Sequence, residues 1–256
     1  MGGDGAVDAS ETRWGAADLH VHTCHDGWGD GNDGVEAIFA HVEERTDLDV
    51  LGIADHDSTE AARAARELFR ERSYRFDFLP GVEVTTTSGH LLCYFPDEIF
   101  DVPSLRPLAW TARLVRERGG LCVLAHPVYP PWLRRSAMDP SSRILQSVDG
   151  VEVVNGGVSV AAQERLDRIA EALGANAALL GNSDSHHKDS IGSAFTAFPG
   201  RSRVDLIDAI RARRTRPVAS ARVNMPRPAR SFTRRRSMTR PGWVRNVYRE
   251  VAGRHR

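Results

Sequence analysis

The chain lacks the residues that mark secreted and membrane proteins. Its three cysteines, Cys24, Cys93 and Cys122, are odd in number and widely spaced, which argues against a disulfide framework. No apolar run is long enough to cross a bilayer, and residues 1–16 lack the apolar centre of a signal peptide. Lys188 is the single lysine, so almost all the positive charge comes from arginine. We therefore expect a cytoplasmic protein without a transmembrane segment.

The formal net charge is zero, but the charge is unevenly distributed. Residues 222–256 contain eleven arginines and one acid, Glu250, so the rest of the chain has ten more acidic than basic residues. The prolines at the start of this Arg-rich tail predict extended or disordered chain, and residues from Gly242 onward predict a helix. Three roles remain open for the tail: docking on the acidic body, neutralising nucleic-acid phosphates, or lying on an anionic membrane surface.

The remaining sequence predicts one domain over residues 17–221, preceded by a flexible leader over residues 1–16. Short apolar runs alternate with helical patterns, which is typical of an α/β fold with a largely parallel sheet. The expected strands are 17–22, 49–54, 76–84 with a break at Pro80-Gly81, 89–95, 121–125, 150–154 and 177–180. The expected helices are 35–45, 59–72, 105–118, 160–173 and 204–214.

The first expected strand carries two imidazoles, His20 and His22, two positions apart. Side chains alternate between the faces of a strand, so both point the same way and can bind one metal ion. His56, His126 and Asp184 each follow the carboxyl end of an apolar strand, the edge that carries the chemistry in barrel folds. Together these positions predict a metal site.

Nitrogen and carboxylate donors of this kind suit Zn²⁺, Mn²⁺ or iron. A single histidine at a strand end is usually a hydrogen-bonded polar residue, but seven at loop–strand junctions are hard to explain by chance. Nine donors are too many for one ion and suit two or three ions bridged by Glu83 or Asp184. The expected ligands are His20, His22, either Asp26 or His25, His56, Glu83, His90, His126, Asp184 and His186.

Six motifs follow one another along the chain: Asp18-Leu19-His20-Val21-His22-Thr23, Ile53-Ala54-Asp55-His56-Asp57, Pro80-Gly81-Val82-Glu83-Val84, Gly89-His90-Leu91-Leu92, Ala125-His126-Pro127 and Ser183-Asp184-Ser185-His186. In this order they resemble the polymerase-and-histidinol-phosphatase (PHP) family of metal-dependent phosphoesterases. The resemblance implies a distorted seven-stranded (β/α) barrel and a trinuclear site. It assigns one ion to His20, His22, Glu83 and Asp184, a second to Glu83, His90 and His126, and a third to a loop ligand, His56 and His186.

The loop after His22 departs from the family pattern, because it is one residue shorter before its Asp-Gly pair. Asp26 keeps the Asp-Gly context and is the expected loop ligand, with His25 as the rival. Cys24 lies close by, but a thiolate beside metal ions would bind them or be oxidised rather than serve as a nucleophile.

The expected reaction is hydrolysis of a phosphomonoester by a metal-activated hydroxide, with no catalytic side chain beyond the ligands. The short interval between His90 and His126 leaves no room for an extra domain, which favours a small nucleotide, sugar phosphate or amino-alcohol phosphate. Arg134, Arg135 and Asn155 are candidate substrate-binding residues.

Three alternatives stay open at this point. The first is a phosphodiesterase or exonuclease that uses the Arg-rich tail to hold nucleic acid. The second is a binding module that keeps its metal ions without turnover. The third is a hydrolase of C–N bonds, because similar ligands recur in barrels of that kind.

Overall fold

The computed structural model describes residues 13–25, 30–128 and 131–220. Most of the expected leader, the expected ligand Asp26 and the Arg-rich tail lie outside these ranges. Within the described residues, no helix is both long enough and apolar enough to cross a bilayer.

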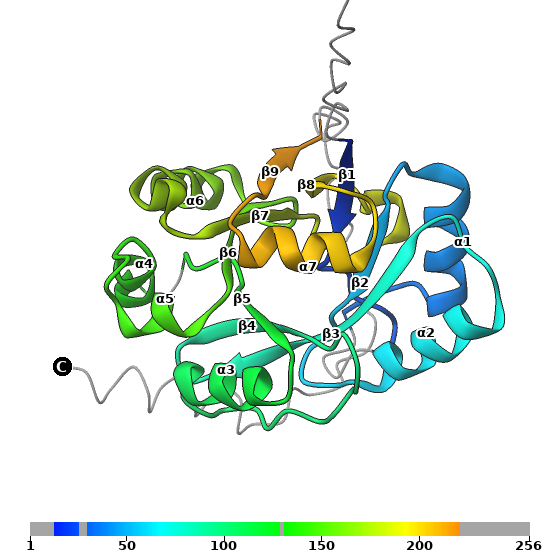
Figure 1. Ribbon diagram of the computed structural model, residues 1–256, viewed down its shortest axis with the longest axis horizontal. Helices are drawn as coiled ribbons and strands as arrows, with labels where there is room; N and C mark the ends of the chain where they lie inside the picture. Colours follow the sequence, from blue (N-terminus) through cyan, green and yellow to red (C-terminus); the bar gives the residue numbers. More distant parts are fainter. Residues whose placement is uncertain (1–12, 26–29, 129–130, 221–256) are drawn as a thin grey trace, which may run out of the picture. The chain divides into compact units, whose positions relative to one another are not determined.

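A single sheet curls into a nearly closed barrel (Figure 1). The order of its nine strands is β7-β6-β5-β4-β3-β2-β1-β8-β9, and an isolated bridge from Val21 to Ser185 links the segments that follow β1 and β7. The distorted α/β barrel expected from the sequence is therefore confirmed, with nine described strands instead of seven. The strands are β1 Trp14–Asp18, β2 Val50–Ile53, β3 Asp77–Thr86, β4 Gly89–Tyr94, β5 Leu121–Leu124, β6 Gly150–Asn155, β7 Ala178–Asn182, β8 Ala194–Pro199 and β9 Arg216–Ala219.

The sheet is mixed, so the expectation of a largely parallel sheet was wrong. Strands β1–β2, β2–β3, β5–β6 and β6–β7 pair in parallel, whereas β3–β4, β4–β5, β1–β8 and β8–β9 pair antiparallel. Only two residues, Thr87 and Ser88, join β3 to β4, and so short a connection can only make a hairpin. Strand β3 also runs unbroken through Pro80-Gly81, where a Cβ on Gly81 would lie 2.7 Å from the Tyr94 ring.

Helices surround the barrel and close one of its ends. They are α1 Val35–Arg45, α2 Glu60–Glu71, α3 Leu108–Glu117, α4 Pro131–Ala137, α5 Arg143–Ser147, α6 Val160–Leu173 and α7 Arg203–Arg211, with short 3₁₀ helices η1 Gly174–Asn176 and η2 Lys188–Ser190. Helices α1 and α6 match their predicted bounds, whereas α4, α5, β8 and β9 had no predicted counterpart. Strand β1 begins at Trp14, so residues 14–16 belong to the sheet and not to the expected leader.

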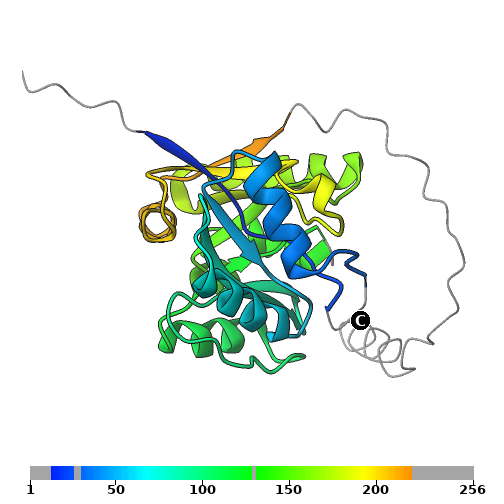
Figure 2. The same ribbon diagram turned by 90° about the vertical axis from the view of Figure 1, so that its right-hand side faces the viewer.

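Three apolar clusters form the core. One joins α1 and α2 to β2 and β3, and a second joins α3 and α6 to β4, β5 and β6. In the third, Leu206 and Ile210 of α7 pack with Val50 and Leu121, which begin their strands. Figure 2 shows α7 end-on, at the left of the strands. Because α7 covers the end of the barrel where the parallel strands begin, the carboxyl ends of these strands form the opposite end.

Candidate metal centre

His20 and His22 lie where the barrel closes. Strand β1 ends at Asp18, but His22 N donates to Ser185 O at 2.8 Å and Ser185 N donates to His20 O at 3.1 Å. These two bonds fix the segment beside the end of β7. Both imidazoles are buried and their ring centroids lie 5.0 Å apart.

Glu83 is the centre of the donor cluster. Its carboxylate is fully buried, and Oε1 lies 2.8 Å from His90 Nδ1 and 3.1 Å from His126 Nε2. Oε2 lies 3.1 Å from His20 Nε2, 3.1 Å from His56 Nδ1 and 3.4 Å from His22 Nε2. One carboxylate therefore touches five imidazoles with its two oxygens, the arrangement needed to bridge ions.

Asp184 lies against the first histidine pair. Its Oδ1 is 3.3 Å from His22 Nε2 and 3.5 Å from His20 Nε2. Its Oδ2 accepts a bond from Asn155 Nδ2 at 3.3 Å. The structure thus brings together the donors that the family resemblance assigns to the first ion.

Among the described loop residues, Asp30 lies beside the two histidines that the resemblance assigns to the third ion. Its Oδ2 lies 3.2 Å from His186 Nε2 and 3.9 Å from His56 Nε2, whereas Asp26 is outside the described residues and His25 is exposed. The sequence reasoning missed Asp30, although its signal was present in a second Asp-Gly pair four residues after the first.

Neighbouring residues tie the Asp30 loop to the segment that carries His186. Asn32 donates from its backbone and its side-chain amide to His186 O, at 3.1 and 2.8 Å. Asp33 accepts from Lys188 N at 2.9 Å and lies 3.3 Å from Lys188 Nζ. The loop carboxylate and His186 are therefore held as one unit.

The donors form four groups whose ligand atoms lie within 4.8 Å of one another. Ions bound to nitrogen and oxygen at about 2.1 Å in a tetrahedron hold neighbouring ligand atoms about 3.4 Å apart. The nitrogen–oxygen distances of 2.8–3.5 Å around Glu83 and Asp184 are close to that spacing, so the residues fit divalent cations. The groups are His20-Glu83-His126, His20-His22-Asp184, His56-Glu83-His90 and His22-Asp30-His56-His186.

Without ions, the cluster shifts the pKa values of its own members. Burial lowers the pKa of His20, but the charges of Glu83 and nearby carboxylates outweigh it and hold that pKa well above its usual range. Burial likewise opposes the attraction of carboxylates at His126 and His186, whose pKa values still rise to about 9. At His56 burial dominates and lowers the pKa to about 4. The carboxylates that raise the pKa values of His20, His126 and His186 are the groups that would also attract cations.

Some donors sit on left-handed backbone. The φ angles are 24° at the donor His126, 51° at the donor Asp184 and 54° at Asp57, which follows the donor His56. Such angles are costly for residues other than glycine and gather at functional sites. His126 and Asp184 each lie two residues beyond the end of a strand, β5 and β7, so the strain falls where the chain leaves the sheet.

The other sequence candidates have different surroundings. Asn155 is buried, and its amide bonds to Glu152 and Asp184. Among the described residues, neither Arg134 nor Arg135 of α4 makes an ion pair, and nothing links either to the donor cluster. The sequence reasoning missed Glu152, although an acid inside the apolar run of β6 was a visible signal.

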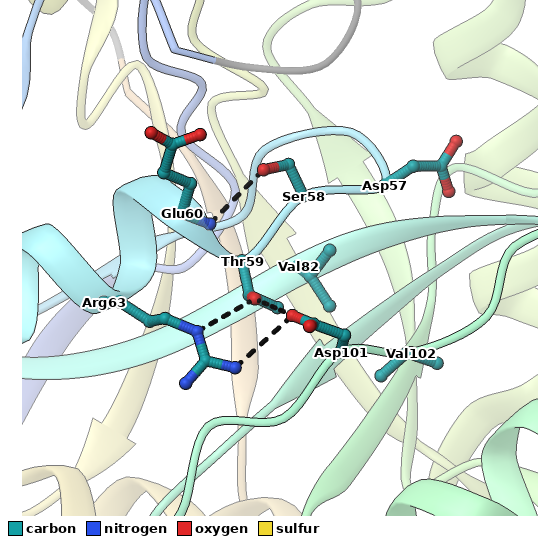
Figure 3. Close-up of a pocket in the computed structure, with 8 residues that line it drawn as sticks. All are labelled: Asp57, Ser58, Thr59, Glu60, Arg63, Val82, Asp101 and Val102. Carbon is teal, nitrogen blue, oxygen red and sulfur yellow. Dashed lines mark hydrogen bonds and ion pairs between the residues drawn. The ribbon is translucent and has the colours of Figure 1, made fainter.

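A pocket of about 280 Å³ lies beside this cluster but outside the barrel. Val82 lines it, and since neighbouring side chains of a strand point to opposite faces, Glu83 faces the other way. Figure 3 shows Thr59 and Arg63 bonded to Asp101 across the pocket, with Asp57 pointing away from them. This pocket is therefore separate from the metal donors.

Comparisons with known proteins agree with this arrangement. The sequence profile of a PHP-associated family (PHP_C) matches residues 162–215. An uncharacterized protein of Methanocaldococcus jannaschii is 30% identical over 147 residues, which cover 54% of this chain and 81% of that protein.

Two solved structures share the fold. A two-domain protein from Bacteroides vulgatus containing a predicted PHP-like metal-dependent phosphoesterase has a TM-score of 0.62 at 16% identity, covering 81% of this chain and 65% of that one. A lesion-specific endonuclease from Pyrococcus furiosus has a TM-score of 0.55 at 18% identity, covering 78% and 56%. From its fold, its strand-end donors and these similarities, we conclude that the chain belongs to the PHP family of metal-dependent phosphoesterases.

Proposed function

We propose that this protein hydrolyses a small phosphomonoester at a centre of two or three divalent ions, Mn²⁺, Fe²⁺ or Zn²⁺. The observation that carries the proposal is the buried Glu83 carboxylate in contact with five imidazoles. We include Asp30 as the loop ligand instead of Asp26, because its carboxylate lies 3.2 Å from His186 and belongs to a donor group with His22 and His56. The proposed ligands are His20, His22, Asp30, His56, Glu83, His90, His126, Asp184 and His186.

Bound divalent ions supply an acidified water near neutral pH and neutralise charge on phosphoryl oxygens. The protein's residues hold these ions and leave one side open. The side chains of His20, His22 and Glu83 are fully buried, whereas those of His126, His186 and Asp30 are 22%, 32% and 44% exposed. We infer that substrate approaches over the exposed donors while the buried ones stay shielded from bulk water.

The chain around the opening supports a small substrate. Only residues 95–107 separate β4, which carries His90, from α3. This segment is too short to form a domain that would cover a long substrate. A metabolite carrying one phosphate is therefore favoured over a polymer.

The test uses the full chain loaded with Mn²⁺ or Zn²⁺. p-Nitrophenyl phosphate, bis-p-nitrophenyl phosphate and a single-stranded oligonucleotide are compared as substrates for the wild type, His20→Ala and Glu83→Gln. The matched control is His41→Ala, because His41 lies outside the donor groups and its nearest acid, Asp189, is 3.9 Å away.

The proposal expects monoester turnover by the wild type and His41→Ala, and loss of both metal and turnover in the other two variants. Cleavage of the diester or oligonucleotide without monoester turnover would support a nuclease instead. Full metal occupancy with no turnover of any phosphoester would support a binding module.

A further inference from the structure

Glu152 of β6 is a fully buried acid that contacts several parts of the metal centre without belonging to a donor group. Its Oε1 lies 3.0 Å from His20 Nδ1 and 2.9 Å from Asn182 Nδ2. Its Oε2 lies 2.9 Å from the backbone nitrogen of His126 and 2.9 Å from Asn155 Nδ2. Each carboxylate oxygen therefore meets two nitrogen atoms.

Three of these four nitrogens can only donate. The backbone N–H is a donor by nature. Asn182 Oδ1 accepts from Leu19 N at 2.9 Å, which turns its amide nitrogen toward Glu152. Asn155 Oδ1 accepts from Gly157 N at 2.8 Å, which turns its amide nitrogen the same way. Because an ionised carboxylate only accepts, the fourth nitrogen must donate as well.

That fourth nitrogen is His20 Nδ1, so the network places a proton on Nδ1. The other ring nitrogen, Nε2, faces Glu83 at 3.1 Å and Asp184 at 3.5 Å. A ligating imidazole commonly donates its second N–H to a carboxylate in this way, which fixes the ring's orientation and tautomer.

We propose that Glu152 is a positioning residue that turns the lone pair of His20 Nε2 toward the metal centre and, through Asn155, orients Asp184. The second arm is the bond from Asn155 Nδ2 to Asp184 Oδ2 at 3.3 Å. This inference rests on the proposed metal centre, and it names a residue that binds neither ion nor substrate.

The test compares full-length wild type with Glu152→Gln. Glutamine has the same size as glutamate, but its amide NH₂ replaces one of the two carboxylate oxygens. In either orientation of the amide, this NH₂ faces two nitrogen donors that the oxygen accepted from in the wild type. The matched control is Tyr94→Phe, which removes a buried bond of 3.1 Å from the Tyr94 hydroxyl to Leu19 O, a backbone group outside the proposed ligand set. Co²⁺ titration followed by visible absorption measures affinity and ligand geometry, and thermal unfolding in EDTA measures the fold alone.

We expect Glu152→Gln to weaken Co²⁺ binding roughly 10- to 100-fold and to change the Co²⁺ spectrum, with an unfolding temperature in EDTA similar to that of Tyr94→Phe. Tyr94→Phe should keep the wild-type spectrum and affinity. Wild-type Co²⁺ binding in Glu152→Gln overturns the inference, as does an equal loss in both variants.

If Glu152→Gln does not fold, Glu152→Asp decides the question with the same measurements. Aspartate keeps the charge but is one methylene too short to meet all four donors, so weaker Co²⁺ binding supports the inference and unchanged binding overturns it. A wild type that binds no Co²⁺ refutes the metal centre itself, which separates failure of the proposed function from failure of this inference.

Discussion

Replacing Gly157 by alanine tests how tightly the protein holds the Asp184 carboxylate. A Cβ on Gly157 would lie 2.7 Å from Asp184 Oδ2 and 3.0 Å from its Cγ, whereas ordinary contact begins at 3.4 Å. The carboxylate must then move by about 0.7 Å, well beyond the tolerance of about 0.2 Å for a metal ligand. At about 1–3 kcal/mol for such overpacking, metal affinity should fall roughly 5- to 150-fold.

The measurement is Zn²⁺ titration against a competing chelator, with kcat/KM for p-nitrophenyl phosphate on the same samples. Gly34→Ala is the control, because a Cβ there meets nothing closer than 3.7 Å and the backbone has an ordinary φ of −77°. Wild-type Zn²⁺ affinity and turnover in Gly157→Ala would show that the carboxylate can move freely, and would refute the reasoning.

Three further predictions concern the loop, the pH dependence and the barrel closure. Asp30→Asn should lower the number of bound ions measured by inductively coupled plasma mass spectrometry, whereas Asp26→Asn should not; the opposite result would restore Asp26 as the ligand. Burial raises the pKa of Asp18 to about 6 from 3.8, so its contribution to stability is present at acid pH and is lost as the pH rises through 6. In EDTA, denaturant unfolding should therefore show the stability of wild type relative to Asp18→Asn falling by about 2 kcal/mol between pH 4 and 7, and a flat difference would contradict this. Thr196→Val removes the hydroxyl that bonds to Gly181 N at 3.0 Å and to Gly181 O at 2.8 Å, and should lower the free energy of unfolding by about 1–3 kcal/mol. The metal content should not change; loss of metal would show that the contact between β7 and β8 also shapes the site.

Regular periodicity made much of the fold predictable. Helix α6 was predicted to the residue because Leu166, Ile169 and Leu173 share a buried face and Ser159 caps the start. Strands β8 and β9 were not predicted. Burial along β9 does not alternate, because its two ends are exposed and its two middle residues are half-buried. Strand β8 lies between β9 and the antiparallel strand β1, which comes from the other end of the described chain.

The site was predictable wherever a donor followed an apolar strand, as His126 follows β5. The sequence offers Asp26 and Asp30 in the same Asp-Gly context, so nothing local decides between them. The contacts that favour Asp30 are long-range, since its neighbour Asn32 bonds to a segment over 150 residues away. Glu152 was missed for a different reason. A buried acid in a strand can pair with any interior donor, and only the fold shows that its partners are the backbone and side chains of the site.

The left-handed residues at the strand ends place stability and activity in opposition. A barrel selected only to fold would carry glycine at positions such as 126 and 184, where a side chain costs about 1–2 kcal/mol. This chain has a histidine and an aspartate at these positions, and its free energy of unfolding is lower by that conformational cost. Substitutions meant to raise the thermal stability of this protein should therefore be made in the helices around the barrel, because glycine at positions 126 and 184 would remove two of the proposed metal ligands.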